Sequence, residues 1–256
     1  MGKTQLKKQI ELVVYDKATS SNTVAKELAQ KGANEGTVVL VKSQSEGRGR
    51  LGRRFISSSE NGLYFTIILR PKIAPTDAIH ITTIGATALC EAIKKTSGQN
   101  AQIKWVNDIY INDKKCAGIL TESQINTKNN TLDYAVIGMG INVLPPKNGF
   151  DVEITDIATS IFEKDAPCGY KQALLNEIVD TFFDYYKDIE KKTYLKSYKE
   201  SSNIIGKEVD VYYGNEIIRG TAIDIDDMAH LIVKTSEEVR AFGSGEARVR
   251  QEGKPL

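Results

Sequence analysis

The sequence predicts an α+β protein, in which a mixed, mainly antiparallel sheet with packed helices is followed by a small all-β domain. Two observations lead to this prediction. Up to residue 202, short β-branched strands are interspersed with segments of helical periodicity. Beyond it, only short strands joined by tight polar turns remain, which is typical of a small β-barrel. We therefore expect two domains, 1–202 and 203–256.

The N-terminal part of the chain contains three expected strands and one helix. Apolar, β-branched runs predict strands at 10–15, 37–41 and 63–69. A run of serine and asparagine at 20–22 can cap a helix, whose pattern ends at Lys31-Gly32. A segment rich in arginine and glycine directly follows the second strand.

The rest of the chain predicts two more helices and the remaining strands. Apolar and small residues fill a helix at 77–95, which we expect to be deeply buried. A second helix, at 170–198, has one apolar face at 3.6-residue spacing. The expected strands between them lie at 102–105, 108–111, 116–122 and 134–143, and the terminal ones at 207–213, 216–223, 230–234 and 247–250.

The composition argues against several classes of function. Lysine and arginine total 34 against 33 aspartates and glutamates, and this net charge of +1 does not indicate a nucleic-acid or membrane partner. Three widely spaced cysteines fit a reduced protein, and two histidines argue against a histidine-bound zinc centre or a Ser-His-Asp relay. Neither a signal peptide nor a membrane-spanning apolar run is found, so we expect a cytoplasmic protein.

The segment 47–54, Gly-Arg-Gly-Arg-Leu-Gly-Arg-Arg, is the most unusual part of the sequence. Glycine lets the backbone approach a ligand closely, and arginine binds phosphate or carboxylate through two parallel hydrogen bonds. We therefore predict a cationic loop that folds over a small anion. A basic surface turn, or a segment that contacts RNA, is the alternative that this segment alone leaves open.

A second unusual segment joins 104–108, Lys-Trp-Val-Asn-Asp, to Lys115 and Gly118 across an expected turn. Strand alternation would place Lys104 and Val106 on one face and the tryptophan on the other. A lysine can neutralise phosphate or carboxylate charge, an aspartate can hold Mg²⁺, and a glycine lets a ligand lie against a strand. The alternative is an ordinary exposed hairpin whose tryptophan covers the core.

Gly138 and Gly140 interrupt an otherwise apolar strand, which indicates a bulge or a close backbone approach. A kinked core strand is the alternative, and no third glycine or following helix makes this a dinucleotide fingerprint. Ser20-Ser21 is interpreted first as a helix cap, although cap hydroxyls can also meet a ligand. We expect His80 and Cys116 to be core residues.

Together these segments resemble, in order and spacing, the biotin protein ligases. The resemblance rests on Ser20-Ser21-Asn22, Gln44 with 47–53, Lys104-Trp105-x-Asn107-Asp108, Lys115-x-Ala117-Gly118-Ile119-Leu120, Gly138-x-Gly140-Ile141-Asn142, Gly206-Lys207-x-Val209 and Gly245-Glu246-x-x-x-Arg250. It implies a class II synthetase-like catalytic domain followed by an SH3-like domain. Because few residues precede the first expected strand, the resemblance is to the monofunctional form without an N-terminal helix-turn-helix, and no DNA binding is expected.

The resemblance implies an enzyme that joins biotin to one lysine of a biotin carboxyl carrier protein. In this family, the biotin carboxylate attacks the α-phosphate of ATP with Mg²⁺, which gives biotinyl-5′-AMP and pyrophosphate. The carrier lysine then displaces AMP. The biotin carboxylate and the ATP phosphates are both anions, so cations must screen their repulsion when they meet. A loop that orders on ligand binding must keep water from the adenylate.

The resemblance also implies a role for each matching residue. The implied biotin-binding residues are Ser20, Ser21, Asn22, Gln44, Gly47, Arg48, Gly49, Arg50, Lys115 and Gly118. The implied ATP-binding residues are Arg48, Arg50, Arg53, Lys104, Asn107, Asp108 and Asn142. The implied catalytic residues are Lys115, Arg50, Arg53 and Asp108. Lys115 would bridge the biotin carboxylate and the α-phosphate, and Asp108 would bind Mg²⁺ or position the nucleotide.

The sequence departs from many relatives at Val106, where they have proline, and at Phe55, where they have tryptophan. Both changes bear on the shape of the pocket and not on its charge. A lipoate or octanoate–protein ligase, which binds a long aliphatic acid, is one alternative function. A non-catalytic nucleic-acid-binding module, which would use the basic loop and the terminal β domain, is the other. By analogy, a homodimer could form through strand 134–143 or another sheet edge.

Overall fold

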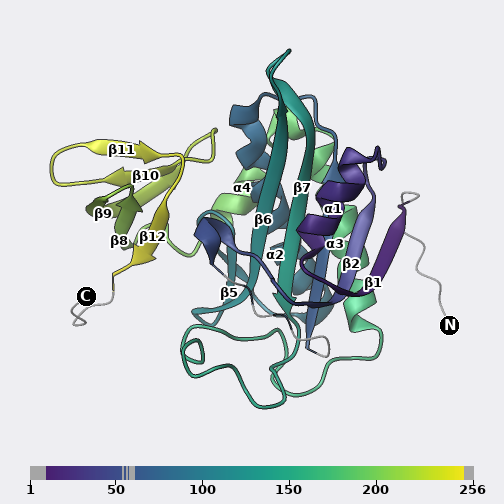
Figure 1. The fold of residues 1–256 in the computed structure, drawn as a ribbon. Helices are drawn as coiled ribbons and strands as arrows, with labels where there is room; N and C mark the ends of the chain where they lie inside the picture. Colours follow the sequence, from purple (N-terminus) through teal and green to yellow (C-terminus); the bar gives the residue numbers. More distant parts are fainter. Residues whose placement is uncertain (1–9, 54, 56, 58–60, 251–256) are drawn as a thin grey trace.

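The computed structural model describes residues 10–53, 55, 57 and 61–250. Its larger part is a seven-stranded sheet with the strand order β1-β2-β3-β7-β6-β5-β4 (Figure 1). The strands are β1 Leu12–Ala18, β2 Val38–Gln44, β3 Gly62–Leu69, β4 Gln102–Lys104, β5 Asp108–Ile111, β6 Lys114–Asn126 and β7 Thr131–Asn142. Only β1 and β2 pair in parallel, and every other pair is antiparallel. The prediction of a mixed, mainly antiparallel sheet is confirmed.

Strand alternation divides the core of this part between the two faces of the sheet. On β3, Phe65 and Ile67 pack with helices α2 (Ile79–Ser97) and α3 (Tyr170–Tyr186), whereas Ile68 packs with α1 (Ser21–Gln30) on the other face. Figure 1 shows α1 and the α2–α3 pair on opposite sides of the sheet. The α2 helix is buried along most of its length, as its apolar sequence predicts, and it ends at Gly98 with a φ of 75°.

The helix expected at 170–198 is instead two helices with a turn between them. The α3 helix ends at Tyr186, and the short helix α4 (Leu195–Glu200) follows after Lys192 adopts a φ of 52°. This turn allows Tyr194 to point into the core, where its hydroxyl lies 2.6 Å from Nδ1 of the buried His80. Periodicity alone could not predict the break, because the apolar spacing continues through it.

The C-terminal part forms a separate five-stranded sheet with the order β11-β10-β9-β8-β12. Its strands are β8 Glu208–Tyr213, β9 Glu216–Ile225, β10 Leu231–Lys234, β11 Val239–Phe242 and β12 Glu246–Val249. The small all-β part is therefore confirmed, although the sequence analysis missed β11. Through residue 250, no pairing between β11 and β12 closes the sheet into a barrel. Trp105 Nε1 donates to the carbonyl oxygen of Ala229 at 3.0 Å and so links the two parts.

Two local expectations are wrong. Strand β4 ends at Lys104, and the next three residues form a turn, so that Trp105 and Val106 are both buried and do not alternate. The strand expected at 134–143 lies between β3 and β6, so its backbone is paired on both sides and cannot form a dimer edge. The edges of this sheet are β1 and β4.

The two residues that were expected to be structural lie in the core. His80 is buried, and burial lowers the pKa of its imidazole below the ordinary value. Cys116 is fully buried, and burial raises the pKa of its thiol to about 12. A thiol with this pKa is not a nucleophile at neutral pH. Within the described residues, no helix combines the length and the apolar character that crossing a bilayer requires.

Candidate active site

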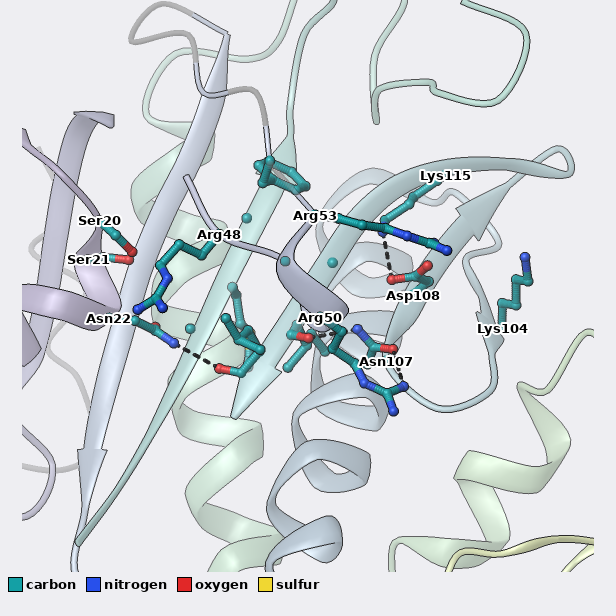
Figure 2. Close-up of a pocket in the computed structure, with 18 of the residues that line it drawn as sticks. Ser20, Ser21, Asn22, Arg48, Arg50, Arg53, Lys104, Asn107, Asp108 and Lys115 are labelled. Carbon is teal, nitrogen blue, oxygen red and sulfur yellow. Dashed lines mark hydrogen bonds and ion pairs between the residues drawn. The ribbon is translucent and has the colours of Figure 1, made fainter. Parts of the chain in front are cut away.

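A pocket opens where the start of α1, the loop after β2 and the middle of β6 and β7 come together (Figure 2). It extends to Gly245 and Glu246 of the C-terminal sheet. It is lined by most of the residues singled out in the sequence: Ser20, Ser21, Asn22, Gln44, Arg48, Gly49, Arg50, Arg53, Lys104, Asn107, Asp108, Lys115 and Gly118. Segments more than a hundred residues apart in the chain thus converge on one cavity.

Two of the predicted site residues do not line this pocket. Gly47 lines an adjoining depression between the loop and β6, and the close approach of Phe55 explains why it is glycine. A Cβ at Gly47 would lie 2.1 Å from the carbonyl oxygen of Phe55. Asn142 lies at the end of β7, where its Nδ2 donates to the carbonyl oxygen of Thr159 at 3.0 Å.

At one end of the pocket, the first turn of α1 presents Ser20, Ser21 and Asn22, all of which are buried. The side chain of Ser20 makes no capping hydrogen bond, so the expected cap is not formed. The backbone N–H of Ser21 donates instead to Oε1 of Gln44 at 2.8 Å. This bond fixes the end of β2 against the positive end of the helix dipole.

Sequence reasoning missed two residues that hold this end of the pocket together, Thr66 and Glu122. The buried Thr66 hydroxyl lies 2.8 Å from Ser21 Oγ and 2.7 Å from Asn22 Oδ1. Glu122 accepts hydrogen bonds from Asn22 Nδ2 at 2.9 Å and from Lys26 Nζ at 2.7 Å. The one threonine within the apolar and aromatic run of β3 was the signal that could have identified Thr66.

Glu122 is charged in this environment. Burial alone would raise the pKa of its carboxyl group, but hydrogen bonds from Lys26 and Asn22 and the charges of Lys26 and Arg48 bring it below the ordinary value. Arg48 Nη1 lies 3.5 Å from Glu122 Oε1. The carboxylate therefore connects the arginine/glycine loop with the first turn of α1.

The loop is held to the protein by its three described arginines. Besides the contact of Arg48 with Glu122, Arg50 Nη1 donates to Asn107 Oδ1 at 3.1 Å. Arg53 Nη2 lies 2.5 Å from Glu246 Oε2 of the C-terminal sheet. The loop therefore spans the pocket, from Glu122 of β6 at one end to Glu246 of β12 at the other.

At the opposite end of the pocket, cations gather on β4 and β6. Lys115 Nζ lies 2.7 Å from Asp108 Oδ1 (Figure 2), and Asp108 faces Gly118 in the register of β5 and β6. The backbone of Lys115 is fixed by Ile157 O, which accepts its N–H, and by its own carbonyl, which accepts from Thr159 N. Burial lowers the pKa of Lys104, whose Nζ lies 5.4 Å from the ring centroid of Tyr110.

The glycines of β7 mark a close approach and not a bulge. The pairing of β7 with β3 is unbroken through Gly138 and Gly140, and the same is true of its pairing with β6 at these residues. A Cβ at Gly138 would lie 2.0 Å from Asn22 Oδ1, and one at Gly140 would lie 2.8 Å from the Phe55 ring. The first approach brings the Asn22 carboxamide directly onto the strand, at the floor of the pocket.

The mixed sheet thus carries one pocket with a hydroxyl-lined recess, a cationic end and an arginine/glycine loop that bridges them. The profile of the biotin/lipoate A/B protein ligase family matches residues 14–142, and that of the biotin protein ligase C terminal domain matches residues 204–250. The chain belongs to the biotin/lipoate A/B protein ligase family.

Relatives of the chain are also named as ligases. It is 34% identical over 238 residues to the bifunctional ligase/repressor BirA of Bacillus subtilis (strain 168), covering 92% of this chain and 73% of the relative. It is 23% identical to the biotin–[acetyl-CoA-carboxylase] ligase of Mycobacterium tuberculosis, over 93% of this chain and 88% of that one. Its fold is shared with a biotin protein ligase from Aquifex aeolicus solved in complex with biotin and ATP, at a TM-score of 0.75 and 23% identity, over 94% of this chain and 99% of that one.

Proposed function

We propose that this protein ligates biotin to a specific lysine of a biotin carboxyl carrier protein. In the first step, a biotin carboxylate oxygen attacks the α-phosphorus of ATP, and the bond from that phosphorus to the pyrophosphate oxygen breaks. Biotinyl-5′-AMP and pyrophosphate result. In the second step, the lysine amine attacks the acyl carbon, loses a proton and displaces AMP. The observation that carries the proposal is the single pocket with a hydrogen-bonding recess at one end and Lys104 and Lys115 at the other.

The two ends of the pocket suit the two substrates. Ser21 and Gln44 offer hydrogen-bonding groups for the ureido ring of biotin. Lys115, Arg50 and Arg53 supply positive charge where the carboxylate and the phosphates must meet, which stabilises the charge that develops at phosphorus. The loop that carries the arginines would also exclude water from the adenylate.

We propose that Mg²⁺ enters with ATP. A metal site made by the protein alone would need several carboxylates, and none of the described residues form such a group. Asp108 is the carboxylate that lines the pocket beside Lys115, and Mg²⁺ is commonly held by one or two carboxylates together with substrate phosphates. Asp108 fits that arrangement, in which the ion supplies further charge at the phosphates.

We further propose that the chain is divided into two domains. A boundary near residue 202 lies between α4 and β8, and so separates a catalytic domain from the small C-terminal domain. Two copies of the chain would pair through β1, an edge strand on which Leu12 and Val14 are exposed. We propose a cytoplasmic location, where the carrier protein and ATP would be available. Sedimentation over a range of concentrations tests the dimer.

The lipoate or octanoate ligase is the rival within the same family, and one experiment separates them. ATP–pyrophosphate exchange is measured with biotin, lipoate and octanoate in turn. Exchange with biotin alone is the expected result, together with its loss in Lys115→Ala. Exchange with lipoate or octanoate in place of biotin would support adenylation of an acid by ATP, but it would show that biotin is not the substrate. The match to the biotin protein ligase C terminal domain, and a relative named as a biotin–[acetyl-CoA-carboxylase] ligase, favour biotin.

A further inference from the structure

The segment 104–108 joins β4 to β5 through a short turn and forms one wall of the pocket. Four of its five residues line the pocket, and Lys104, Asn107 and Asp108 are labelled in Figure 2. Val106, in the middle of the turn, is the residue of this segment that does not line the pocket, and it is buried. The segment thus presents four residues to the pocket and is rooted in the protein interior through the fifth.

On the pocket side, the segment is tied to groups that are expected to meet ATP. Asn107 Oδ1 accepts from Arg50 Nη1 at 3.1 Å, and Asp108 Oδ1 lies 2.7 Å from Lys115 Nζ. An anion that binds Arg50 and Lys115 must compete with both contacts. Contacts outside this exchange must then hold the segment, and the bonds of the Asn107 amide and carbonyl to Ile119 of β6 are two of them.

Behind the turn lies Tyr198 of α4, a fully buried side chain whose hydroxyl donates to the carbonyl oxygen of Val106 at 3.0 Å. Burial raises the pKa of this phenol well above its ordinary value, so the hydroxyl keeps its proton and acts as the donor. Because both residues are buried, loss of the hydroxyl would leave a buried carbonyl oxygen without this donor. The bond therefore fixes the middle of the turn from the side opposite to the substrates.

Two further contacts support the segment from residues outside the pocket. The N–H of Ile103, directly before the segment, donates to the carbonyl oxygen of Ser201 at 2.8 Å. Trp105 Nε1 donates to the carbonyl oxygen of Ala229 at 3.0 Å. Ala229 has a φ of 59°, in a turn that the Asp226 carboxylate holds by accepting two main-chain N–H groups. Residues late in the chain thus support a wall of the pocket that they do not themselves line.

We propose that Tyr198, together with the turn around Ala229, positions the nucleotide wall of the pocket. The Tyr198 hydroxyl keeps the segment in the geometry in which Asn107 and Asp108 meet ATP and its Mg²⁺. The inference rests on the proposed function, because it concerns the ATP end of the same pocket. The recess at the start of α1 is built from other segments of the chain, so loss of the hydroxyl should affect ATP and not biotin.

The test compares Tyr198→Phe with Tyr194→Phe. Both side chains are fully buried one helical turn apart, and each change removes one hydroxyl at nearly constant shape. The Tyr194 hydroxyl lies within hydrogen-bond distance of His80 and Thr83 of α2, neither of which lines the pocket. Tyr194→Phe is therefore the matched control for the loss of a buried hydrogen bond away from the substrates.

ATP–pyrophosphate exchange gives kcat and KM for each substrate, and urea unfolding gives the stability of each variant. For Tyr198→Phe we expect kcat/KM for ATP to fall by about tenfold, as for one lost buried hydrogen bond, with KM for biotin within about twofold of wild type. Tyr194→Phe should shift the urea midpoint similarly and leave both kinetic values within about twofold of wild type. An equal kinetic loss in the two variants would indicate general loosening of the fold and would overturn the inference.

A second readout asks whether Tyr198 acts through the segment. In an Asp108→Asn background, a carboxylate that the turn positions is already gone. Tyr198→Phe should therefore lower kcat/KM for ATP by less in this background than in wild type, when both are measured at saturating Mg²⁺. Full additivity of the two changes would show that Tyr198 acts elsewhere, and it would contradict the proposed role.

The outcomes separate this inference from the proposed function. If wild type shows no exchange with biotin, both are wrong. If wild type exchanges with biotin and Tyr198→Phe has unchanged kinetics for ATP, only the positioning role is wrong. Should Tyr198→Phe fail to fold, Asp226→Ala carries the test, because its side chain is 35% exposed and its loss loosens the turn that holds Trp105. An unchanged kcat/KM for ATP in that variant would again overturn the inference.

Discussion

Lys115 and Asp108 form an ion pair of 2.7 Å on neighbouring strands, inside the pocket that is expected to receive ATP. The side chains are 35% and 24% exposed, so water still reaches both. Each charge is balanced by the other when no substrate is bound. Binding of an anion between them must therefore compete with Asp108 for the lysine, and Mg²⁺ at the carboxylate would release it.

Replacing Lys115 by methionine should abolish most of the adenylation activity. The change removes the positive charge near the developing negative charge on phosphorus and keeps an unbranched side chain of nearly the same length. We expect the ATP–pyrophosphate exchange rate to fall by about a hundredfold or more. The neighbouring Lys114→Met is the matched control, because Lys114 Nζ contacts the carbonyl oxygen of Thr155 outside the pocket. Equal losses in the two variants would contradict a specific role for Lys115.

Replacing Arg50 by glycine should let the activated intermediate escape. Arg50 connects the loop to Asn107, and its removal frees the middle of the loop. We expect biotin to be transferred to lysines of bystander proteins, which streptavidin blotting would detect after incubation with albumin. Arg240→Gly, on β11 and paired with Glu238, is the control that should label the carrier alone. Labelling restricted to the carrier in Arg50→Gly would sink this prediction.

Gly138→Ala and Gly118→Ala should affect different steps. The new Cβ at Gly138 would displace Asn22, so KM for biotin should rise by about tenfold or more. The one at Gly118 would lie 3.3 Å from the end of the flexible Lys115 side chain, so it should lower kcat and change KM for biotin little. Steady-state exchange kinetics separate the two parameters. The same pattern in both variants would refute the division of the pocket into two ends.

Acidification should remove a small part of the stability through Glu122. The pKa of Glu122 is lowered in the folded protein, so below its ordinary value of 4.5 the unfolded chain binds more protons. The stabilising contribution is therefore complete above pH 4.5 and is lost as the pH falls through the lowered pKa. The free energy of unfolding, measured with urea at a series of pH values, should depend less on pH in Glu122→Gln than in wild type. The difference should be below about 1 kcal/mol, because the group is partly exposed. The exposed turn variant Glu153→Gln should match wild type.

Removal of Mg²⁺ should test the role of Asp108. Chelation of Mg²⁺ should stop ATP–pyrophosphate exchange. Asp108→Asn should raise the Mg²⁺ concentration that gives the half-maximal rate by about tenfold, which is the effect expected when a metal ligand, or a group that orients one, is lost. Asp113→Asn, in the turn between β5 and β6, should leave that concentration unchanged. If Asp108→Asn instead raises only KM for ATP, the carboxylate positions the nucleotide and is not a ligand.

The sequence was informative where one short segment carries the signal. The loop 47–54 and the glycines of β7 stand out because both break the usual composition of their elements. That the loop and these glycines meet at one pocket could be expected from the resemblance to the family, in which the same motifs occur in the same order. The open sheet edge at β1 and the interior place of β7 could not, since strand order depends on pairings between distant segments.

The residues that were missed act through tertiary contacts. Thr66 meets Asn22 from 44 positions away, and Glu122 meets it from 100 positions away. Glu122 forms no local pattern, and Thr66 is marked only as the one threonine in the apolar run of β3. Similarly, β11 has four residues and the turn at Lys192 interrupts a continuing apolar pattern, so local propensity could identify neither of them.

Trp105 is the only tryptophan of the chain, and it lines the pocket while its indole donates to Ala229 of the C-terminal part. The tryptophan fluorescence of the protein therefore comes from one ring at the junction of the two parts. A red shift in emission would report separation of these parts, and quenching at constant wavelength would report a ligand beside the ring. The protein thus contains its own optical probe for substrate titrations, with no label attached.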